Sequence, residues 1–246
     1  IRSKHSAERQ IAYFSRHHLH VPTFDMLRAE HLISFNGRSF DLKVLWGNDV
    51  FKDVSSKMLQ TPHYDILHTF YEKHKSRVSL DNFSQITLKE SKLMSGIKSV
   101  EMWRVGMMLL YCINGAIDYP MDLPITDEMA LQFSEDLNEP SKKVIDAITS
   151  DGKGSRTIEE IGMLSSLPRL KNHESEVLFQ DAGLLFQEVI DYCIDDVLKT
   201  EALYKHIQKN GKLSFYDMKK GKKRSVRMPI GTQLIIQDPK NVDIPF

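Results

Sequence analysis

The stretch His31-Leu32-Ile33-Ser34-Phe35-Asn36-Gly37-Arg38-Ser39-Phe40-Asp41 decides the fold of this chain. Its apolar run from Leu32 to Phe35 predicts a strand, and the Asn-Gly pair that follows predicts the turn that ends it. Asp41 comes next, where a short helix is expected to begin. Taken alone, Asp41 is explained as the N-cap of that helix. An acid just beyond the end of a strand is also well placed to bind a ligand.

A second informative segment, Tyr192-Cys193-Ile194-Asp195-Asp196, lies far downstream in a helical pattern. Tyr192 and Asp196 are four residues apart, so both side chains project from the same face of a helix. The polar edge of an amphipathic helix would also explain this pair. Neither segment indicates a function alone, whereas their combination in this order does.

The composition sets limits on the class of protein. The chain has 246 residues and 41% hydrophobic content, enough for one large domain or two small ones. Its 33 Lys and Arg residues balance 33 Asp and Glu residues, so no global positive field indicates a nucleic-acid partner. Any nucleic-acid binding must rely on a local patch. Cys112 and Cys193 lie in apolar helical patterns and are predicted to be core residues in a reducing compartment.

No segment is predicted to cross a membrane. The longest strongly apolar run, Met107–Ile113, is far shorter than the ~20 residues that a spanning helix needs. The sequence does not open with a signal-peptide pattern. We therefore expect a soluble, cytoplasmic protein without a membrane partner.

The first half of the chain predicts a mixture of strands and helices. A helix is expected from Ala7 to about His17. Residues 64–71 fit either a strand or a helix, and a strand that enters a helix is the favoured interpretation. Ser79 is expected to cap a short helix. A longer helix follows, and its predicted apolar face consists of Val100, Trp103, Met107, Leu110 and Tyr111.

Residues 118–183 differ in character and are predicted to be a helical insertion. Three helices are expected to begin in it, at Thr126, Ser141 and Thr157. The helix at Thr157 is expected to begin with a capping box. The third should end at Pro168. Asp151–Ser155 is expected to be a mobile loop, and the last strong helix is predicted from Leu184 to His206.

Convergent carboxylates suit the hydrolysis of phosphodiester bonds. That reaction uses two divalent cations ~3.5–4 Å apart, one to activate water and one to stabilise the leaving oxygen. Oxygen ligands select Mg²⁺ or Mn²⁺ over softer metals. Because like charges repel, a carboxylate cluster is a poor structural device in the absence of cations. A tyrosine hydroxyl beside the cluster can hold or polarise the attacking water.

Asn36-Gly37-Arg38-Ser39-Phe40-Asp41 and Tyr192-Cys193-Ile194-Asp195-Asp196 together resemble the second and third motifs of the DEDD 3'-5' exonucleases, in the tyrosine subclass. The segment between them resembles predicted 3'-5' exonucleases related to the proofreading domain of family-B DNA polymerases. The positions that carry this further resemblance are Ser79-Leu80-Asp81, Lys92, Gly96, Lys98, Trp103 and Gly106. The resemblance covers roughly residues 6–113 and 184–206.

The resemblance implies an α/β fold of the ribonuclease H-like superfamily, a mixed sheet flanked by helices, with the helical insertion outside it. It implies a two-ion site for Mg²⁺ or Mn²⁺, in which Asp41 and Asp196 are catalytic metal ligands and Tyr192 orients the water. The implied reaction is metal-dependent 3'-5' exonuclease hydrolysis. The expected partners are single-stranded DNA 3' ends, or RNA ends, and Asn36 is expected to contact the nucleic acid.

The family's first motif, an Asp-x-Glu on the central strand, is absent from this chain. Its nearest spacing match, Glu174-Ser175-Glu176, follows the second motif, so its order is wrong. We expect the missing carboxylates upstream of Ile1, because a sheet without its central strand leaves backbone groups unpaired. The alternative is a catalytically degenerate exonuclease-fold module that binds nucleic acid or a protein partner.

The predicted organisation has four parts. Residues 1–117 are the first part of the exonuclease domain, without its N-terminal strands. Residues 118–183 are the helical insertion, a candidate surface for a protein partner. Residues 184–210 are the last helix of the exonuclease domain, with the third motif, and residues 211–246 are a basic C-terminal tail.

The basic tail is a candidate nucleic-acid contact. Its Lys222, Lys223 and Arg224 are candidates for binding phosphates, and Phe215 and Tyr216 are candidates for stacking on bases. A solvated, charged tail without such a function is the open alternative.

Overall fold

The computed structural model describes residues 31–37, 41, 61–114, 124–164 and 166–230. Helices and strands are both present, which fits the predicted α/β class. The described strands form three two-stranded sheets, so the larger mixed sheet stays a prediction. The helix predicted at 7–17 and the one predicted directly after Asp41 lie outside the described residues.

The chain divides into two compact units. The first unit comprises Ile1–Lys92 and Ile194–Phe246, and the second comprises Leu93–Cys193. Helix α10, Asn172–Asn210, passes from the second unit into the first. It begins well before the predicted start at Leu184, so the predicted end of the insertion falls inside one continuous helix.

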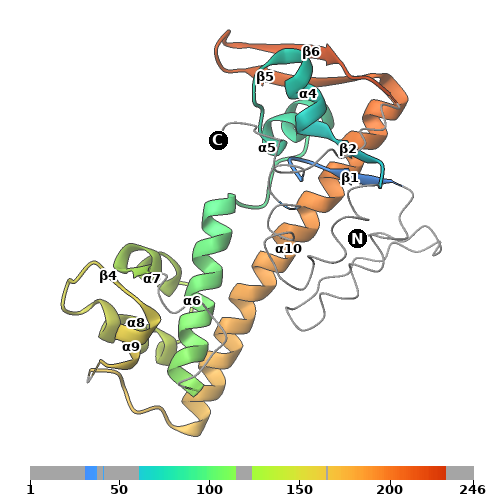
Figure 1. The fold of residues 1–246 in the computed structure, drawn as a ribbon. Coiled ribbons are helices and arrows are strands. Elements are labelled where there is room, and N and C mark those ends of the chain that lie inside the picture. Colours follow the sequence, from blue (N-terminus) through green and yellow to red (C-terminus); the bar gives the residue numbers. More distant parts are fainter. Residues whose placement is uncertain (1–30, 38–40, 42–60, 115–123, 165, 231–246) are drawn as a thin grey trace. The chain divides into compact units, whose positions relative to one another are not determined.

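Two short parallel strands begin the described part of the first unit (Figure 1). Strand β1, Leu32–Ser34, pairs with strand β2, His63–Asp65, and helix α4, Ile66–His74, follows β2 directly. The predicted strand at 32–35 and the predicted change from strand to helix within 64–71 are therefore confirmed. Because the strands are parallel, their carboxyl ends meet at one edge of the pair.

Residues predicted as part of a basic tail form a β-hairpin. Strands β5, Lys212–Asp217, and β6, Lys222–Arg227, pair antiparallel through their full length. Phe215 of β5 is only 3% exposed, and its ring centroid lies 5.2 Å from that of Phe70 in α4. A side chain in the core is not available for stacking on bases, so that prediction was wrong for Phe215. Tyr216, its neighbour on the strand, is 40% exposed.

The core of the first unit is rich in aromatic rings. Helix α5, Leu80–Phe83, is capped by Ser79, as predicted, and continues into the π-helical turn η3, Ser84–Leu88. Phe83 meets Phe70 in an edge-to-face contact with 5.1 Å between the ring centroids. The same core includes residues from β2, α4, α10 and the hairpin: Tyr64, Ile66, Leu203, Ile207, Leu213 and Val226. It therefore fixes these elements relative to one another.

The described part of the second unit is helical apart from one short antiparallel pair of strands. Its elements before α10 are α6 (Gly96–Asn114), β3 (Ile125–Thr126), α7 (Asp127–Ser134), α8 (Glu139–Thr149), β4 (Ser155–Arg156) and α9 (Ile158–Gly162). The predicted caps at Thr126 and Thr157 are confirmed. Thr157 also forms the predicted capping box, with Glu160.

Two predicted helix limits in this unit were wrong. Helix α8 begins at Glu139, with Pro140 in its first turn, where the missing N–H of proline is tolerated. Ser141, the predicted start, lies inside the helix and donates its hydroxyl hydrogen bond to the buried Asp181. Helix α9 ends at Gly162, well before the predicted limit.

The buried face of α6 differs from the predicted one. Val100 and Trp103 are 50% and 41% exposed. The α6 residues that are buried in the core of the second unit are Met102, Val105, Met108 and Leu109. Trp103 packs instead against Phe186 of α10, with 4.6 Å between ring centroids. Apolar residues occur on more than one face of this helix, so their spacing alone did not select the buried face.

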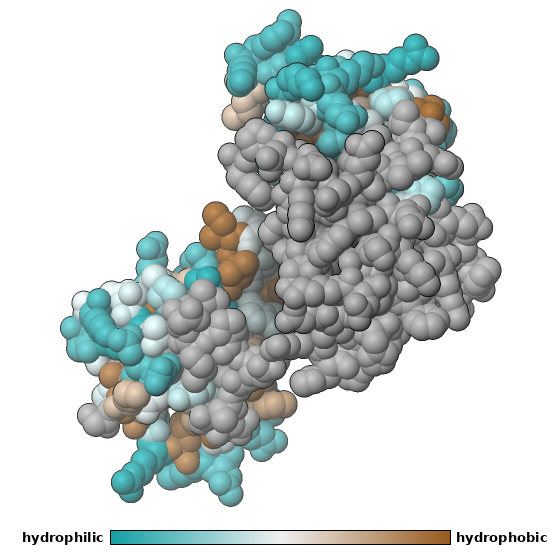
Figure 2. Space-filling model, viewed as in Figure 1, coloured by the Kyte–Doolittle hydropathy of each residue, from teal (hydrophilic) through white to brown (hydrophobic). Residues whose placement is uncertain are grey.

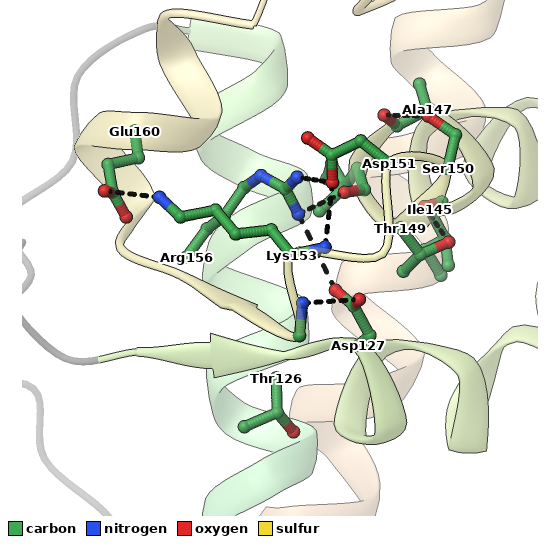
Figure 3. Close-up of polar contacts among 12 residues, drawn as sticks. Thr126, Asp127, Ile145, Ala147, Thr149, Ser150, Asp151, Lys153, Arg156 and Glu160 are labelled. Carbon is green, nitrogen blue, oxygen red and sulfur yellow. Dashed lines mark hydrogen bonds and ion pairs between the residues drawn. The ribbon is translucent and has the colours of Figure 1, made fainter.

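The loop predicted to be mobile, Asp151–Ser155, is tied down by polar contacts (Figure 3). Arg156 is 2% exposed; its guanidinium pairs with Asp151 and lies 3.6 Å from a carboxylate oxygen of Asp127. Lys153 pairs with Glu160 at 2.7 Å. The loop is thus held to the starts of both α7 and α9.

Within the described residues, no helix combines the length and the apolar character needed to span a membrane. Cys112 is half-buried, and burial raises the pKa of its thiol to about 12. Cys193 is exposed, so the prediction that it is a core residue was wrong.

Candidate active site

Polar side chains join the two parallel strands at their carboxyl edge. The Ser34 hydroxyl lies 2.7 Å from Nε2 of His63 and donates to Oδ2 of Asp65 at 3.1 Å. Asp65 is completely buried, and its Oδ1 caps helix α4 by accepting from the backbone N–H of His68 at 3.0 Å. Hydrogen-bonded polar groups in a buried position hold β1, β2 and α4 in one arrangement.

The same carboxylate fixes the turn after β1. The backbone N–H of Asn36 donates to Oδ1 of Asp65 at 3.0 Å, and Asn36 has a left-handed φ of 65°, which Asn adopts more readily than most residues. Gly37 is buried, and a Cβ placed there would lie 2.5 Å from Cβ of Ser34. The predicted Asn-Gly turn is confirmed. Its geometry gives Asn36 a structural role, and the predicted contact of Asn36 with nucleic acid stays a prediction.

Asp41 stands in an unfavourable electrostatic environment. Its side chain reaches solvent, yet the surrounding protein removes enough water to raise its pKa. The negative charges of Asp65 and Asp196 raise the pKa of Asp41 further, and a hydrogen bond from its own backbone N–H partly opposes them. The structure therefore places Asp41 close enough to Asp196 for the two predicted site residues to repel each other.

Asp196 lies on the part of α10 that belongs to the first unit. Its Oδ2 accepts from Nζ of Lys92 at 3.1 Å, in an ion pair whose side chains are 26% and 20% exposed, respectively. Its Oδ1 is buried and accepts no hydrogen bond from any described residue. A buried acceptor without a donor costs about 1–3 kcal/mol. This oxygen therefore has an unused capacity to bind a donor or a cation.

Tyr192 lies one helical turn before Asp196 but belongs to the second unit. It is half-buried, and its hydroxyl oxygen lies 3.5 Å from the place that a Cβ would occupy at Gly96, the first residue of α6. The predicted helical setting of Tyr192 is thus confirmed. Its predicted role in orienting water stays a prediction.

The donor chemistry fits a divalent cation in part. Carboxylate oxygens are the preferred ligands of Mg²⁺ and Mn²⁺, and the unpartnered Oδ1 of Asp196 together with the repulsion at Asp41 is what a cation would relieve. However, the described residues contain no group of three or more His, Cys, Asp or Glu side chains that is arranged to hold a metal ion. Asp41 and Asp196 therefore fit as members of a ligand set, and they do not complete one.

The basic residues of the hairpin differ from one another in exposure. Lys222 and Lys223 are exposed. Figure 2 shows a hydrophilic surface over the hairpin. Arg224 is half-buried, pairs with Asp217 at 2.9 Å, and lies over the ring of Phe215 at 5.9 Å from its centroid. Arg224 therefore stabilises the hairpin, while the two lysines face solvent. That any of the three binds nucleic acid stays a prediction.

Comparison with known proteins adds one finding. Residues 2–111 match the family model of the RNase H superfamily. The match supports an α/β fold of this superfamily and a nuclease-type function that acts on nucleic acid, and RNase H-like nucleases generally use divalent metal ions. The matched range contains Asp41 and Asp65, whereas Tyr192 and Asp196 lie beyond it. The comparisons with curated proteins and with solved structures found no match.

The sequence patterns did not single out Asp65, which holds the turn before Asp41 in place. Its signal was its position, because an acid between a strand and a helix is a typical N-cap. Its contact with the turn before Asp41 joins residues that are 29 positions apart, and a local pattern does not reveal such a contact.

Proposed function

We propose that this protein is a metal-dependent 3'-5' exonuclease of the tyrosine-bearing DEDD class, which hydrolyses phosphodiester bonds at the 3' ends of single-stranded DNA. The observation that carries the proposal is the buried Oδ1 of Asp196, which accepts no hydrogen bond from any described residue, and the negative charge of Asp196 also contributes to the raised pKa of Asp41. Proximity of like charges lowers stability unless a cation compensates for it. The match to the RNase H superfamily supports the same class of chemistry.

Each proposed site residue has a separate task. Asp41 and Asp196 hold Mg²⁺ or Mn²⁺ through carboxylate oxygens, and the bound ions supply water activation and stabilisation of the leaving oxygen. Tyr192 orients the attacking water through its hydroxyl group. Lys222 and Lys223 bind phosphates of the strand, which adds affinity without sequence preference.

The direct test is a cleavage assay with the full-length protein. With Mg²⁺ or Mn²⁺ present, a 5'-labelled single-stranded DNA should shorten stepwise from its 3' end, and a matched RNA in a parallel reaction measures the preference for DNA. Asp41→Ala and Asp196→Ala should each lower the rate on the order of a thousandfold, because each removes a metal ligand. Tyr192→Phe should lower it roughly tenfold to a hundredfold, as expected for the loss of one positioned proton-transfer or water-binding group.

Asp191→Asn is the matched control, since Asp191 is an exposed acid on the same helix and accepts only from Gln187 among the contacts described. It should leave the rate unchanged. An Asp196→Ala variant as fast as the wild type would show that the assignment is wrong.

The ion pair between Lys92 and Asp196 favours a second candidate function, because a lysine can keep such an aspartate in a fold that has lost catalysis. This candidate is a degenerate module that binds nucleic acid. It predicts salt-sensitive binding without cleavage at any metal concentration. It also predicts that Asp41→Asn leaves the binding unchanged.

A further inference from the structure

The segment that carries Lys92 is fixed from two sides. The backbone N–H of Lys92 donates to Oδ1 of Asp81 in helix α5 at 3.0 Å. The carbonyl of the preceding residue, Ser91, accepts a hydrogen bond from Nζ of Lys199 in helix α10. Lys199 is 3% exposed, and its ammonium also pairs with Asp195, one turn earlier on the same helix. A buried ammonium with these partners is a rigid anchor rather than a surface charge.

Helix α10 therefore supports both members of the Lys92–Asp196 pair. Asp196 belongs to the helix itself, and its neighbour Asp195 orients the lysine that holds the backbone beside Lys92. Asp81 fixes the same backbone from the other side. The contact of 3.1 Å between Lys92 and Asp196 is thus positioned by three further side chains, which distinguishes it from a chance surface ion pair.

We propose that Lys92 is a built-in counter-ion of Asp196 that competes with a divalent cation for this carboxylate, and that Lys199 and Asp81 are positioning residues for it. The proposal rests on the proposed function, because it concerns the ion that the nuclease site would bind. A cation on Oδ2 of Asp196 would lie within roughly 5 Å of the Lys92 ammonium, because Oδ2 is 3.1 Å from Nζ and bonds to such a cation are near 2.1 Å. Like charges at that distance repel, so the binding of the cation weakens the Lys92–Asp196 pair.

Equilibrium binding of Mn²⁺ to the full-length protein tests the proposal without relying on activity. It can be measured by calorimetry or by the electron paramagnetic resonance of free Mn²⁺. Lys92→Met should bind Mn²⁺ roughly twofold to fivefold more tightly than the wild type, the range expected when a partly exposed competing ion pair is removed. Lys205→Met is the matched control. It removes the same charge from a lysine that pairs with Glu201 at 2.8 Å on α10, outside the candidate site, and it should leave the affinity unchanged.

The positioning role has its own readout. Asp81→Ala should tighten Mn²⁺ binding about twofold by loosening the segment, and this gain should vanish in the Lys92→Met background, because coupled residues are not additive. Asp81→Asn has the same charge as Asp81→Ala and retains the acceptor for the Lys92 N–H, so it should bind Mn²⁺ like the wild type. Additive effects of Asp81→Ala and Lys92→Met would overturn the positioning role.

The remaining outcomes separate this inference from the proposed function. Unchanged or weaker Mn²⁺ binding by Lys92→Met overturns the counter-ion role, while the proposed nuclease site stands if Asp196→Asn abolishes Mn²⁺ binding in the same assay. Absence of Mn²⁺ binding by the wild-type protein overturns both this inference and the metal-dependent function.

Discussion

Replacing Asp65 by alanine should destabilise the first unit, and the structure allows the size of the effect to be worked out contact by contact. The carboxylate accepts hydrogen bonds from the backbone N–H groups of Asn36 and His68 and from the Ser34 hydroxyl. The hydroxyl has a second partner in His63, so its loss is partly compensated. The two N–H groups have no second acceptor among the described residues, and a buried donor left without an acceptor costs about 1–3 kcal/mol. The expected loss for Asp65→Ala is therefore about 4 kcal/mol.

Asp65→Asn separates the hydrogen bonds from the charge. Its side-chain oxygen can still accept from Asn36 and His68, and its amide can donate to Ser34 if the hydroxyl reverses. A loss of about 1 kcal/mol is expected, because hydrogen bonds to a neutral acceptor are weaker than those to a carboxylate. Glu72→Ala is a control on the same helix. Glu72 is 53% exposed, and its loss should cost about 0.5 kcal/mol or less.

Urea unfolding measures the global loss for these variants, and hydrogen exchange of the α4 amides locates it. Asp65→Ala should lower the unfolding midpoint and speed exchange at the start of α4, while the amides of α8 in the second unit stay unchanged. An Asp65→Ala protein within about 1 kcal/mol of the wild type, with normal exchange in α4, would refute the view that this carboxylate ties the turn to the helix.

Three further predictions follow from other contacts. Desolvation, and after it the charges of Asp65 and Asp196, raise the pKa of Asp41. The ionised carboxylate therefore lowers the stability of the fold at pH values above this raised pKa. This loss disappears as the pH falls below 3.8, the ordinary pKa of the group. Asp41→Asn should therefore raise the urea midpoint at about pH 7 and leave it unchanged near pH 3, and an equal effect at both would contradict this reasoning. Gly37→Ala should lower the free energy of unfolding by about 1–3 kcal/mol, because its Cβ would lie 2.5 Å from Ser34. If thermal unfolding shows no loss of stability, the turn can move aside. Gly106→Ala gains about 1 kcal/mol of helix propensity but places a Cβ 2.7 Å from the Phe186 ring. A net loss of about 1–2 kcal/mol in the free energy of unfolding is therefore expected in the same assay. A net gain would mean that the ring repacks freely.

Local signals account for the parts of the fold that were predictable from the sequence. The strand at β1, the Asn-Gly turn, the caps at Ser79 and Thr126, and the capping box at Thr157 each depend on residues within a few positions of one another. Helix α10 is longer than predicted, because it continues through a glycine before the predicted start at Leu184. Gly183 lies inside it, and glycine opposes a helix by only about 1 kcal/mol, which the burial of Leu178 and Leu185 outweighs.

The contacts that were not predictable join distant segments. Phe215 stands two residues before the turn of a strongly basic hairpin, and its burial against Phe70 follows from the pairing of β5 with the core rather than from its neighbours. The contact of Lys92 with Asp196 spans 104 positions. The resemblance to exonucleases pointed to Lys92 only as a shared position, and the ion pair became visible in the structure.

The three acids Asp41, Asp65 and Asp196 fall into two kinds, and the difference separates structure from proposed function. Asp65 is completely buried and its oxygens accept three hydrogen bonds from described residues, so the fold itself explains why an acid stands there. Hydrogen bonds from the described residues give no such explanation for Asp41 or Asp196. Asp41 is repelled by both other acids, and Asp196 retains a buried oxygen without a donor among the described residues. Both features oppose folding as they stand, and a divalent cation would convert both into attraction. Stability that rises with added Mn²⁺ in the wild type, and not in Asp196→Asn, would link that unfavourable electrostatics directly to a site for the ion.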